Sequence, residues 1–205
     1  MTDERKEREG PTGEILAEAV SIVEREGVPY LAIGGIASSV WGEPKPIRDI
    51  DLFVRESDAR RTLDAFARAG YHTEHADPEW LLKAVKDDVL VDVIYNVNRQ
   101  VCIDDEMLRR GASREVEGTE LRVLAAEDLV VALAISNRDD TGYWYDALSV
   151  LAHAHLDWDY LLRRADAGRE RVLSLLLYAR ADGIAIPDGP VQTLATRVLG
   201  GVEAA

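Results

Sequence analysis

Residues 32–54 of this chain read AIGGIASSVWGEPKPIRDIDLFV, and two features of this stretch decide the fold. The glycine pair Gly34-Gly35 ends an apolar run that predicts a strand, and a short helix is expected to follow it. Further on, Asp49 and Asp51 are separated by one apolar residue inside a second β-prone run. Because side chains alternate along a strand, we expect both carboxylates on one face and apolar neighbours on the other.

This pair of acids needs a compensating charge. Two adjacent carboxylates raise each other's pKa unless a cation lies between them, and all-oxygen ligands favour Mg²⁺ or Mn²⁺. A structural salt bridge from Asp49 to Arg48 or Arg55 is the alternative, but it leaves Asp51 and the glycine pair unexplained. The glycines let a phosphate approach the backbone, and the start of the following helix offers free N–H groups. The pattern predicts metal-assisted phosphoryl or nucleotidyl transfer.

A third acid lies in another β-prone segment. Residues 88–97 form a nearly continuous apolar run around Asp92 and predict a central strand. A carboxylate in such a run must be paired, ligated or protonated, because burying it alone is costly. If this strand lies beside the Asp49–Asp51 strand, the three carboxylates form a cluster able to hold two metal ions about 3.5–4 Å apart.

The chain resembles the nucleotidyltransferase superfamily of DNA polymerase β in four successive features: the glycine pair, the spacer, the Asp-x-Asp and a later Asp on an apolar strand. Within it, the stretch 32–54 is most similar to the bacterial minimal nucleotidyltransferases and the abortive-infection type II toxin-like group. The resemblance extends over about residues 30–97. It implies that Asp49 and Asp51 bind metal and nucleotide phosphates, while Asp92 binds a second metal and helps to deprotonate an attacking hydroxyl. The residues implied to contact the triphosphate are Gly34, Gly35 and a serine at the helix start, Ser38 or Ser39.

The chain also departs from the superfamily pattern. Related sequences often carry Arg-x-Thr before the Asp-x-Asp; here 45–47 is Lys-Pro-Ile, followed by Arg48, which we keep as a candidate nucleotide contact. Many relatives place a phosphate-binding lysine on the first helix after the catalytic half, and residues 127–134 contain none. Arg138 is a candidate substitute, since a guanidinium binds phosphate through two hydrogen bonds.

Composition sets the remaining limits. Of the 205 residues, 47% are hydrophobic and 30% charged, as in an ordinary globular protein, and the sequence predicts no membrane span. A single cysteine, Cys102, and an N-terminus without an apolar signal core predict a cytoplasmic protein. The net charge of −14 disfavours a polyanion such as tRNA and favours a cationic acceptor, although a local basic patch can override it.

The element pattern predicts an α/β (α+β) fold, with a small mixed β-sheet nucleotidyltransferase core flanked by helices and followed by an all-helical C-terminal half. We expect a disordered tail at 1–11, a catalytic domain at 12–124 and a helical domain at 125–205. Three further expectations concern local structure. Residues 78–85 are predicted as a short helix, Ser57-Asp58 as a helix cap, and 115–123 as a terminal hairpin arm.

These observations predict a metal-dependent enzyme that moves a nucleoside monophosphate from an NTP to an acceptor hydroxyl and releases pyrophosphate. The acceptor, whether a small molecule, a protein or tRNA, is not fixed by the sequence, and a protein partner stays open. The alternative is a catalytically weakened nucleotide-binding protein or toxin–antitoxin component of the same fold, which the missing lysine suggests.

Overall fold

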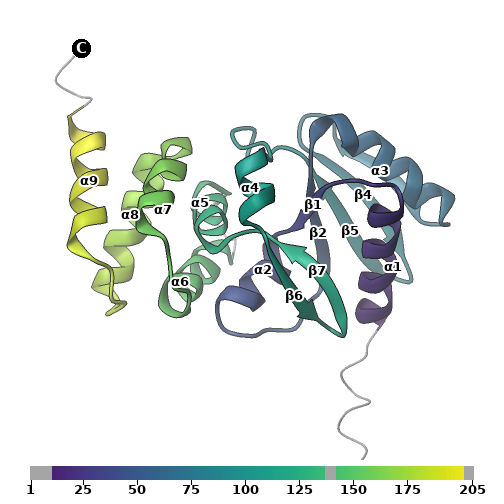
Figure 1. Ribbon diagram of the computed structural model, residues 1–205, viewed down its shortest axis with the longest axis horizontal. Coiled ribbons are helices and arrows are strands. Elements are labelled where there is room, and N and C mark those ends of the chain that lie inside the picture. Colours follow the sequence, from purple (N-terminus) through teal and green to yellow (C-terminus); the bar gives the residue numbers. More distant parts are fainter. Residues whose placement is uncertain (1–10, 137–141, 201–205) are drawn as a thin grey trace, which may run out of the picture. The chain divides into compact units, whose positions relative to one another are not determined.

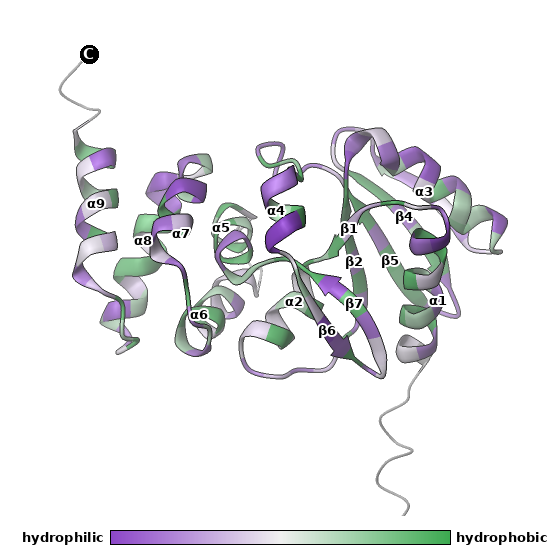
Figure 2. Ribbon diagram, viewed as in Figure 1, coloured by the Kyte–Doolittle hydropathy of each residue, from purple (hydrophilic) through white to green (hydrophobic). Residues whose placement is uncertain are grey.

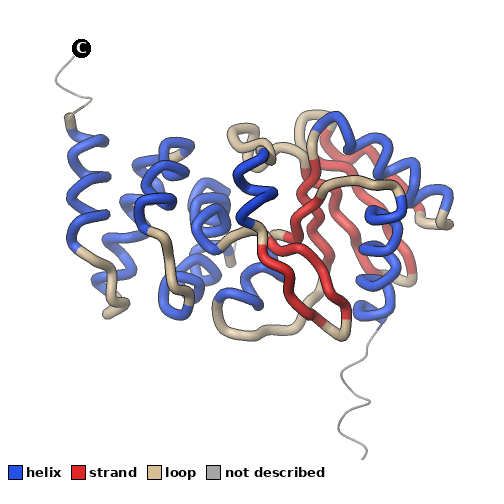
Figure 3. The backbone as a smooth tube through the Cα atoms, in the orientation of Figure 1, coloured by secondary structure: helices blue, strands red, loops and turns tan. Residues whose placement is uncertain are grey.

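The computed structural model describes residues 11–136 and 142–200, so residues 1–10 of the tail expected at 1–11 and the candidate Arg138 lie outside the described residues, whereas Pro11 begins a helix. The chain divides into two compact units, each described separately below. Unit 1 consists of residues 1–40 and 45–125, and unit 2 of residues 41–44 and 126–205. Figure 1 labels the elements, and Figure 3 separates helices from strands.

Unit 1 is built on a seven-stranded mixed sheet in the order β3-β4-β5-β2-β1-β7-β6. β1 pairs in parallel with β7 and β2 with β5, and the other neighbouring strands are antiparallel. The fold class predicted from the sequence is therefore confirmed. The strands are β1 (Tyr30–Ala32), β2 (Asp49–Val54), β3 (His72–Asp77), β4 (Leu81–Lys86), β5 (Val89–Ile94), β6 (Ala112–Val116) and β7 (Thr119–Val123).

Helices cover one face of this sheet. α1 packs against β5, β7 and α3, and α3 packs against β3, β4 and β5; Figure 1 shows α1 and α3 beside β4 and β5. The helices of unit 1 are α1 (Pro11–Arg25), α2 (Gly34–Trp41, whose last residue falls in unit 2), α3 (Glu56–Arg68) and α4 (Asp105–Arg110). The helices bury an apolar stripe of the sheet, and Figure 2 shows the hydrophobic colouring concentrated on its central strands.

The alternation of side chains separates this core from a polar row. On β2, Ile50 and Leu52 are completely buried, whereas Asp49 and Asp51 point to the other side and stay partly accessible. β5 repeats the pattern around Asp92, between buried valines. The face opposite the apolar stripe therefore presents the acidic side chains.

Two sequence expectations are wrong, and a third is confirmed. Residues 81–86 form strand β4 and not a helix, because they pair with β5 through a two-residue turn at Asp87-Asp88, where both φ angles are positive. The N-cap of α3 is Arg55, with no side-chain cap bond, in place of Ser57-Asp58. The predicted hairpin at 115–123 is confirmed as the antiparallel β6–β7 pair, which begins at Ala112, and β7 also joins the main sheet beside β1.

Unit 2 is helical in its described part, and α5 is its buried element. α5 packs against α6, α7 and α8, and its residues from Ala126 to Ile135 are all buried. The helices are α5 (Ala126–Ser136), α6 (Tyr143–His153), α7 (Trp158–Arg164), α8 (Arg169–Ala181) and α9 (Asp188–Leu199), with a 3₁₀ turn at Ala165–Ala167.

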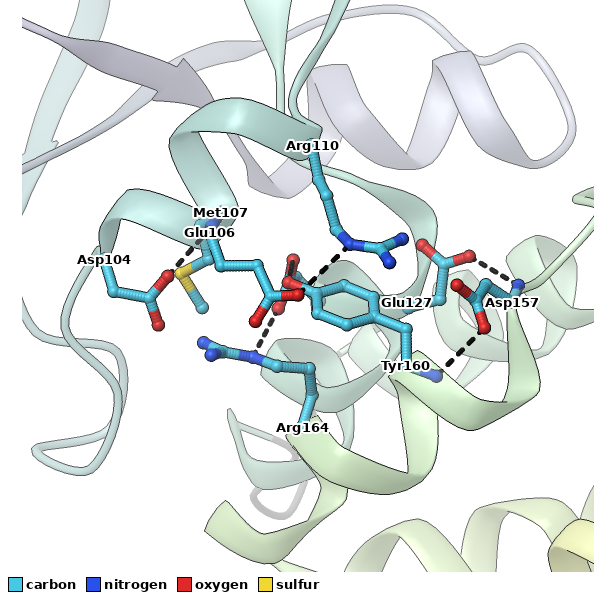
Figure 4. A network of polar contacts seen from close by, with 9 residues as sticks. Asp104, Glu106, Met107, Arg110, Glu127, Asp157, Tyr160 and Arg164 are labelled. Atoms are coloured by element: carbon cyan, nitrogen blue, oxygen red, sulfur yellow. Dashed lines mark hydrogen bonds and ion pairs between the residues drawn. The ribbon is translucent and has the colours of Figure 1, made fainter.

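Two acids on α5 are engaged in structural contacts, and Figure 4 labels one of them, Glu127, together with Asp157, Tyr160 and Arg164. Asp128, whose side chain is 0% exposed, accepts a hydrogen bond from the Tyr160 hydroxyl at 2.7 Å and pairs with Arg164 Nε at 2.7 Å. Glu127 accepts from the backbone N–H of Asp157 at 2.7 Å, and Asp157 in turn caps α7 through the N–H of Tyr160. A buried carboxylate is tolerated here because it is paired and hydrogen-bonded.

The described helices include none that combines the length and the apolar character needed to cross a bilayer.

Replacing Asp128 by alanine should lower the free energy of unfolding by about 3–5 kcal/mol, because it leaves Arg164 without its buried counter-charge and the Tyr160 hydroxyl without its acceptor. Urea unfolding followed by tryptophan fluorescence measures the change. The matched control is Asp166→Ala: Asp166 also pairs with an arginine, Arg169, but is 52% exposed, and its loss should cost no more than about 1 kcal/mol. Equal costs for the two variants would contradict the structural role of Asp128.

Candidate active site

The site is built by strand pairing. In the parallel β2–β5 ladder the Cα partner of Asp51 is Asp92, and in the antiparallel β4–β5 ladder the partner of Asp92 is Lys83. Three neighbouring strands therefore carry charged residues in one row across the sheet. Asp49 lies two residues before Asp51 on the same face, at the first position of β2.

The sequence pattern did not single out Lys83 as a site residue. Its Nζ lies 3.5 Å from Asp92 Oδ1, an ion pair that is too long for a good hydrogen bond, and that oxygen has no hydrogen-bond partner among the described residues. The side chains are 31% exposed for Lys83 and 14% for Asp92. The missed signal was the Asp87-Asp88 turn between two β-prone segments, because a two-residue hairpin loop at 87–88 sets the register that places residue 83 opposite residue 92.

The glycine turn closes over the carboxylates from the end of β1. α2 begins at Gly34, whose φ is +57°, and a Cβ at this position would lie 2.0 Å from Asp51 Oδ2. The backbone N–H of Gly35 donates a hydrogen bond to Asp51. The conformation and the absent side chain at residue 34 thus make room for Asp51 at the N-terminus of α2, where the helix dipole favours a negative charge.

The row contains three acids and one base, so acidic groups outnumber basic ones. Burial raises the pKa of Asp51 to about 8, helped by the charges of Asp49 and Asp92 and opposed by the Gly35 N–H and by Lys83. Burial also raises the pKa of Asp92, while Lys83 counteracts it. Carboxylates that resist ionisation in this way lack sufficient positive charge around them.

The donor set suits a hard divalent cation. Three carboxylates from two paired strands supply only oxygen ligands, as Mg²⁺ and Mn²⁺ prefer, and Asp92 Oδ1 has a lone pair that no hydrogen bond uses within the described chain. Within the described ranges, no three or more His, Cys, Asp or Glu side chains lie close enough together to hold a metal ion. The three carboxylates therefore fit a metal ion by their oxygen chemistry and by their common face of the sheet. A bound ion would require them to move closer together.

The remaining candidates lie around α2. Ser38 is buried, and its hydroxyl has no hydrogen-bond partner within the described ranges. The Ser39 hydroxyl accepts from the Lys45 N–H at 3.2 Å and donates to the Lys45 carbonyl at 3.3 Å, so it holds the loop that follows α2. Arg48 is exposed next to Asp49.

Comparisons with known proteins place this chain in a class. Residues 12–180 match a family model of nucleotidyl transferases, so the protein is an enzyme of this class. The chain belongs to the family described as "Nucleotidyl transferase of unknown function (DUF2204)". The resemblance to the nucleotidyltransferase superfamily that the sequence suggests is confirmed. No curated protein matches the sequence.

Solved structures that are similar to this chain have low sequence identity and TM-scores below 0.5. ANT(2")-Ia in complex with adenylyl-2"-tobramycin is 14% identical, with 84% of this chain and 99% of that chain covered and a TM-score of 0.49. The lincosamide antibiotic adenylyltransferase LnuA, bound to lincomycin, is 12% identical, with 69% and 96% covered and a TM-score of 0.48. A tRNA nucleotidyltransferase complexed with a primer tRNA and an incoming ATP analogue is 17% identical, with 80% and 60% covered and a TM-score of 0.36.

The close approach of Gly34 to Asp51 is testable by a double-mutant cycle. Gly34→Ala should destabilise the protein by about 1–3 kcal/mol more than Gly27→Ala, because the new methyl group collides with the carboxylate. Gly27 is the matched control: its φ is +64°, and a Cβ there would meet nothing within 4 Å. In an Asp51→Ala background the extra cost at residue 34 should disappear. Thermal unfolding measures all four variants, and a cost that persists without Asp51 would contradict the steric explanation.

Proposed function

We propose that this nucleotidyltransferase is metal-dependent and moves a nucleoside monophosphate from an NTP to an acceptor hydroxyl, with release of pyrophosphate. The observation that carries the proposal is the row formed by Asp51 and Asp92 on paired strands, with Asp49 on the same face and the start of α2 beside it. Acids concentrated in this way, with raised pKa values, favour a cation-binding function over a purely structural one.

Asp49, Asp51 and Asp92 would hold the metal ions. Bound Mg²⁺ or Mn²⁺ would supply positive charge to the phosphate oxygens of the nucleotide, and this is the chemistry that the carboxylates alone cannot provide. The chain itself contributes the fixed spacing of the carboxylates, because strand pairing and not flexible loops determines it.

In the proposed reaction, Asp92 accepts the proton of the acceptor hydroxyl. The acceptor oxygen forms a bond to the α-phosphorus, the bond from that phosphorus to the bridging oxygen of the β-phosphate breaks, and pyrophosphate leaves with the electron pair. Burial raises the pKa of Asp92, which makes it a better proton acceptor than an exposed aspartate. Positioning and charge neutralisation, and not a covalent enzyme intermediate, would provide the rate enhancement.

The start of α2 is the proposed phosphate-binding element. Free N–H groups and the dipole at a helix N-terminus attract anions, and the Gly35 N–H already serves the Asp51 carboxylate. A cation on Asp51 would then lie between the acid and the phosphate. The other proposed nucleotide contacts are Gly34, Ser38, Ser39, Arg48 and Arg138.

We further propose that residues 12–124 act as the catalytic domain and 125–205 as a helical domain. The acceptor of the enzyme is a small molecule, a protein or tRNA, and the net charge of −14 favours an acceptor that carries positive charge. Cytoplasmic function, in a compartment that contains NTP and Mg²⁺, remains a prediction from the sequence.

One observation favours the weaker alternative, a nucleotide-binding or toxin–antitoxin component with reduced catalysis. α5 contains no lysine, and its acids Glu127 and Asp128 are committed to contacts within unit 2. If the phosphates receive no cation from this helix, triphosphate affinity would be lower than in relatives that have one. Nucleotide binding by calorimetry without pyrophosphate release would support this alternative.

The direct test is transfer from α-labelled NTPs with Mg²⁺ or Mn²⁺ to a panel of hydroxyl-bearing small molecules, tRNA and proteins. Asp49→Asn and Asp51→Asn should each lower transfer at least about 100-fold, because each removes a metal ligand whose contribution is several kcal/mol. Thermal unfolding should show that both variants remain folded.

Asp64→Asn is the matched control, because Asp64 is an exposed acid on α3, and its substitution should leave transfer unchanged. Wild-type rates in both site variants would refute the metal-dependent mechanism. Pyrophosphate release that persists after chelation of divalent cations would refute it independently.

A further inference from the structure

Lys83 gives the row of acids a cation of its own. The β4–β5 ladder places it opposite Asp92, and its ammonium group lies 3.5 Å from Asp92 Oδ1. Its charge also lowers the pKa of Asp51, although less than burial raises it. The lysine therefore acts on two of the three carboxylates.

Strand pairing fixes the position of Lys83, because its backbone belongs to β4 and not to a loop. On the same strand, Lys86 points to the opposite face and pairs with Glu18 of α1 at 2.8 Å. The two lysines have nearly equal side-chain exposure, 31% and 29%, and differ in which acids they meet. A charge at residue 83 therefore has an effect at the acidic row that a charge at residue 86 does not share.

We propose that Lys83 is the counter-ion of the nucleotide-free site, and that it makes tight binding of a divalent cation depend on a bound nucleotide. The inference rests on the proposed function, because it takes Asp92 as a metal ligand. It adds a residue and an order of binding that the acids alone do not define.

The physical argument is competition for Asp92. Without nucleotide, a divalent cation at this carboxylate meets the fixed positive charge of Lys83, and two cations near one acid repel each other. A triphosphate offers Lys83 other anionic partners, so the ammonium group can leave Asp92 and the acid becomes available to the metal. The two ligands are then coupled, and each raises the affinity for the other.

A simpler explanation is that Lys83 forms only a partly exposed salt bridge. Such a pair contributes little to stability. It predicts a small change in unfolding temperature after substitution and no change in metal affinity. Metal affinity in the absence of nucleotide therefore separates the two explanations.

The experiment is a Mn²⁺ titration of the full chain by electron paramagnetic resonance, with and without an ATP analogue that cannot be cleaved between the α- and β-phosphates. Lys83→Gln should bind Mn²⁺ at least about tenfold more tightly than the wild type when nucleotide is absent, because a repelling charge is removed. The coupling between Mn²⁺ and nucleotide should fall by the same factor. Lys83→Met, which keeps the chain length, provides a second neutral variant if the first does not fold.

Two controls complete the design. Lys86→Gln removes the same charge from the same strand, and Lys83→Arg keeps the charge in place; both should bind Mn²⁺ as the wild type does. Unchanged Mn²⁺ affinity in both neutral Lys83 variants, together with nucleotide-assisted Mn²⁺ binding by the wild type, would overturn the inference and leave the proposed function standing. A wild-type protein that binds no Mn²⁺ in either state would overturn both.

Discussion

The pairing of β5 with β2 on one side and β4 on the other is the constraint on which the site depends. It places Asp51, Asp92 and Lys83 in one row, at spacings that backbone hydrogen bonds fix. Burial of the apolar face stabilises this arrangement, since Ile50, Leu52, Val91 and Val93 are completely buried on the side opposite the acids and α1 and α3 pack against β5. The like charges on the other face cannot separate without breaking that core. Because the acids are held close together, a bound cation would lower the energy of this site.

The glycine turn shows how close packing supports this charge arrangement. Sequence reasoning assigns Gly34 to the approach of a phosphate, whereas the structure shows that its missing side chain first accommodates the Asp51 carboxylate. Both explanations follow from the same property, since a backbone without Cβ permits a close neighbour. With the Gly35 N–H donating to Asp51, the start of α2 and the acids of β2 form one polar unit.

Unit 2 uses its acids differently. On α5, Asp128 lies among buried apolar side chains, but Tyr160 and Arg164 satisfy it, so the helix carries a charge without forming an open site. Asp92 is held less closely: its ion pair with Lys83 is 3.5 Å long, whereas Asp128 pairs with Arg164 at 2.7 Å and also accepts a hydrogen bond from Tyr160. Burial alone does not distinguish the two acids; the length of the ion pair and the hydrogen bond from Tyr160 do.

The sequence by itself determined the fold class, the strand that carries Asp49 and Asp51, and the apolar strand around Asp92, because period-two alternation and β propensity are local properties. It could not assign β4, since Lys83 and Lys86, like Leu82 and Val85, are three residues apart and also fit a helix, and only pairing with β5 decides between the two. The tertiary structure therefore decided that Lys83 faces Asp92. It also decided that Asp51 lies against Gly34, because contacts between segments far apart in the chain follow from strand order and register, and local sequence carries no record of either.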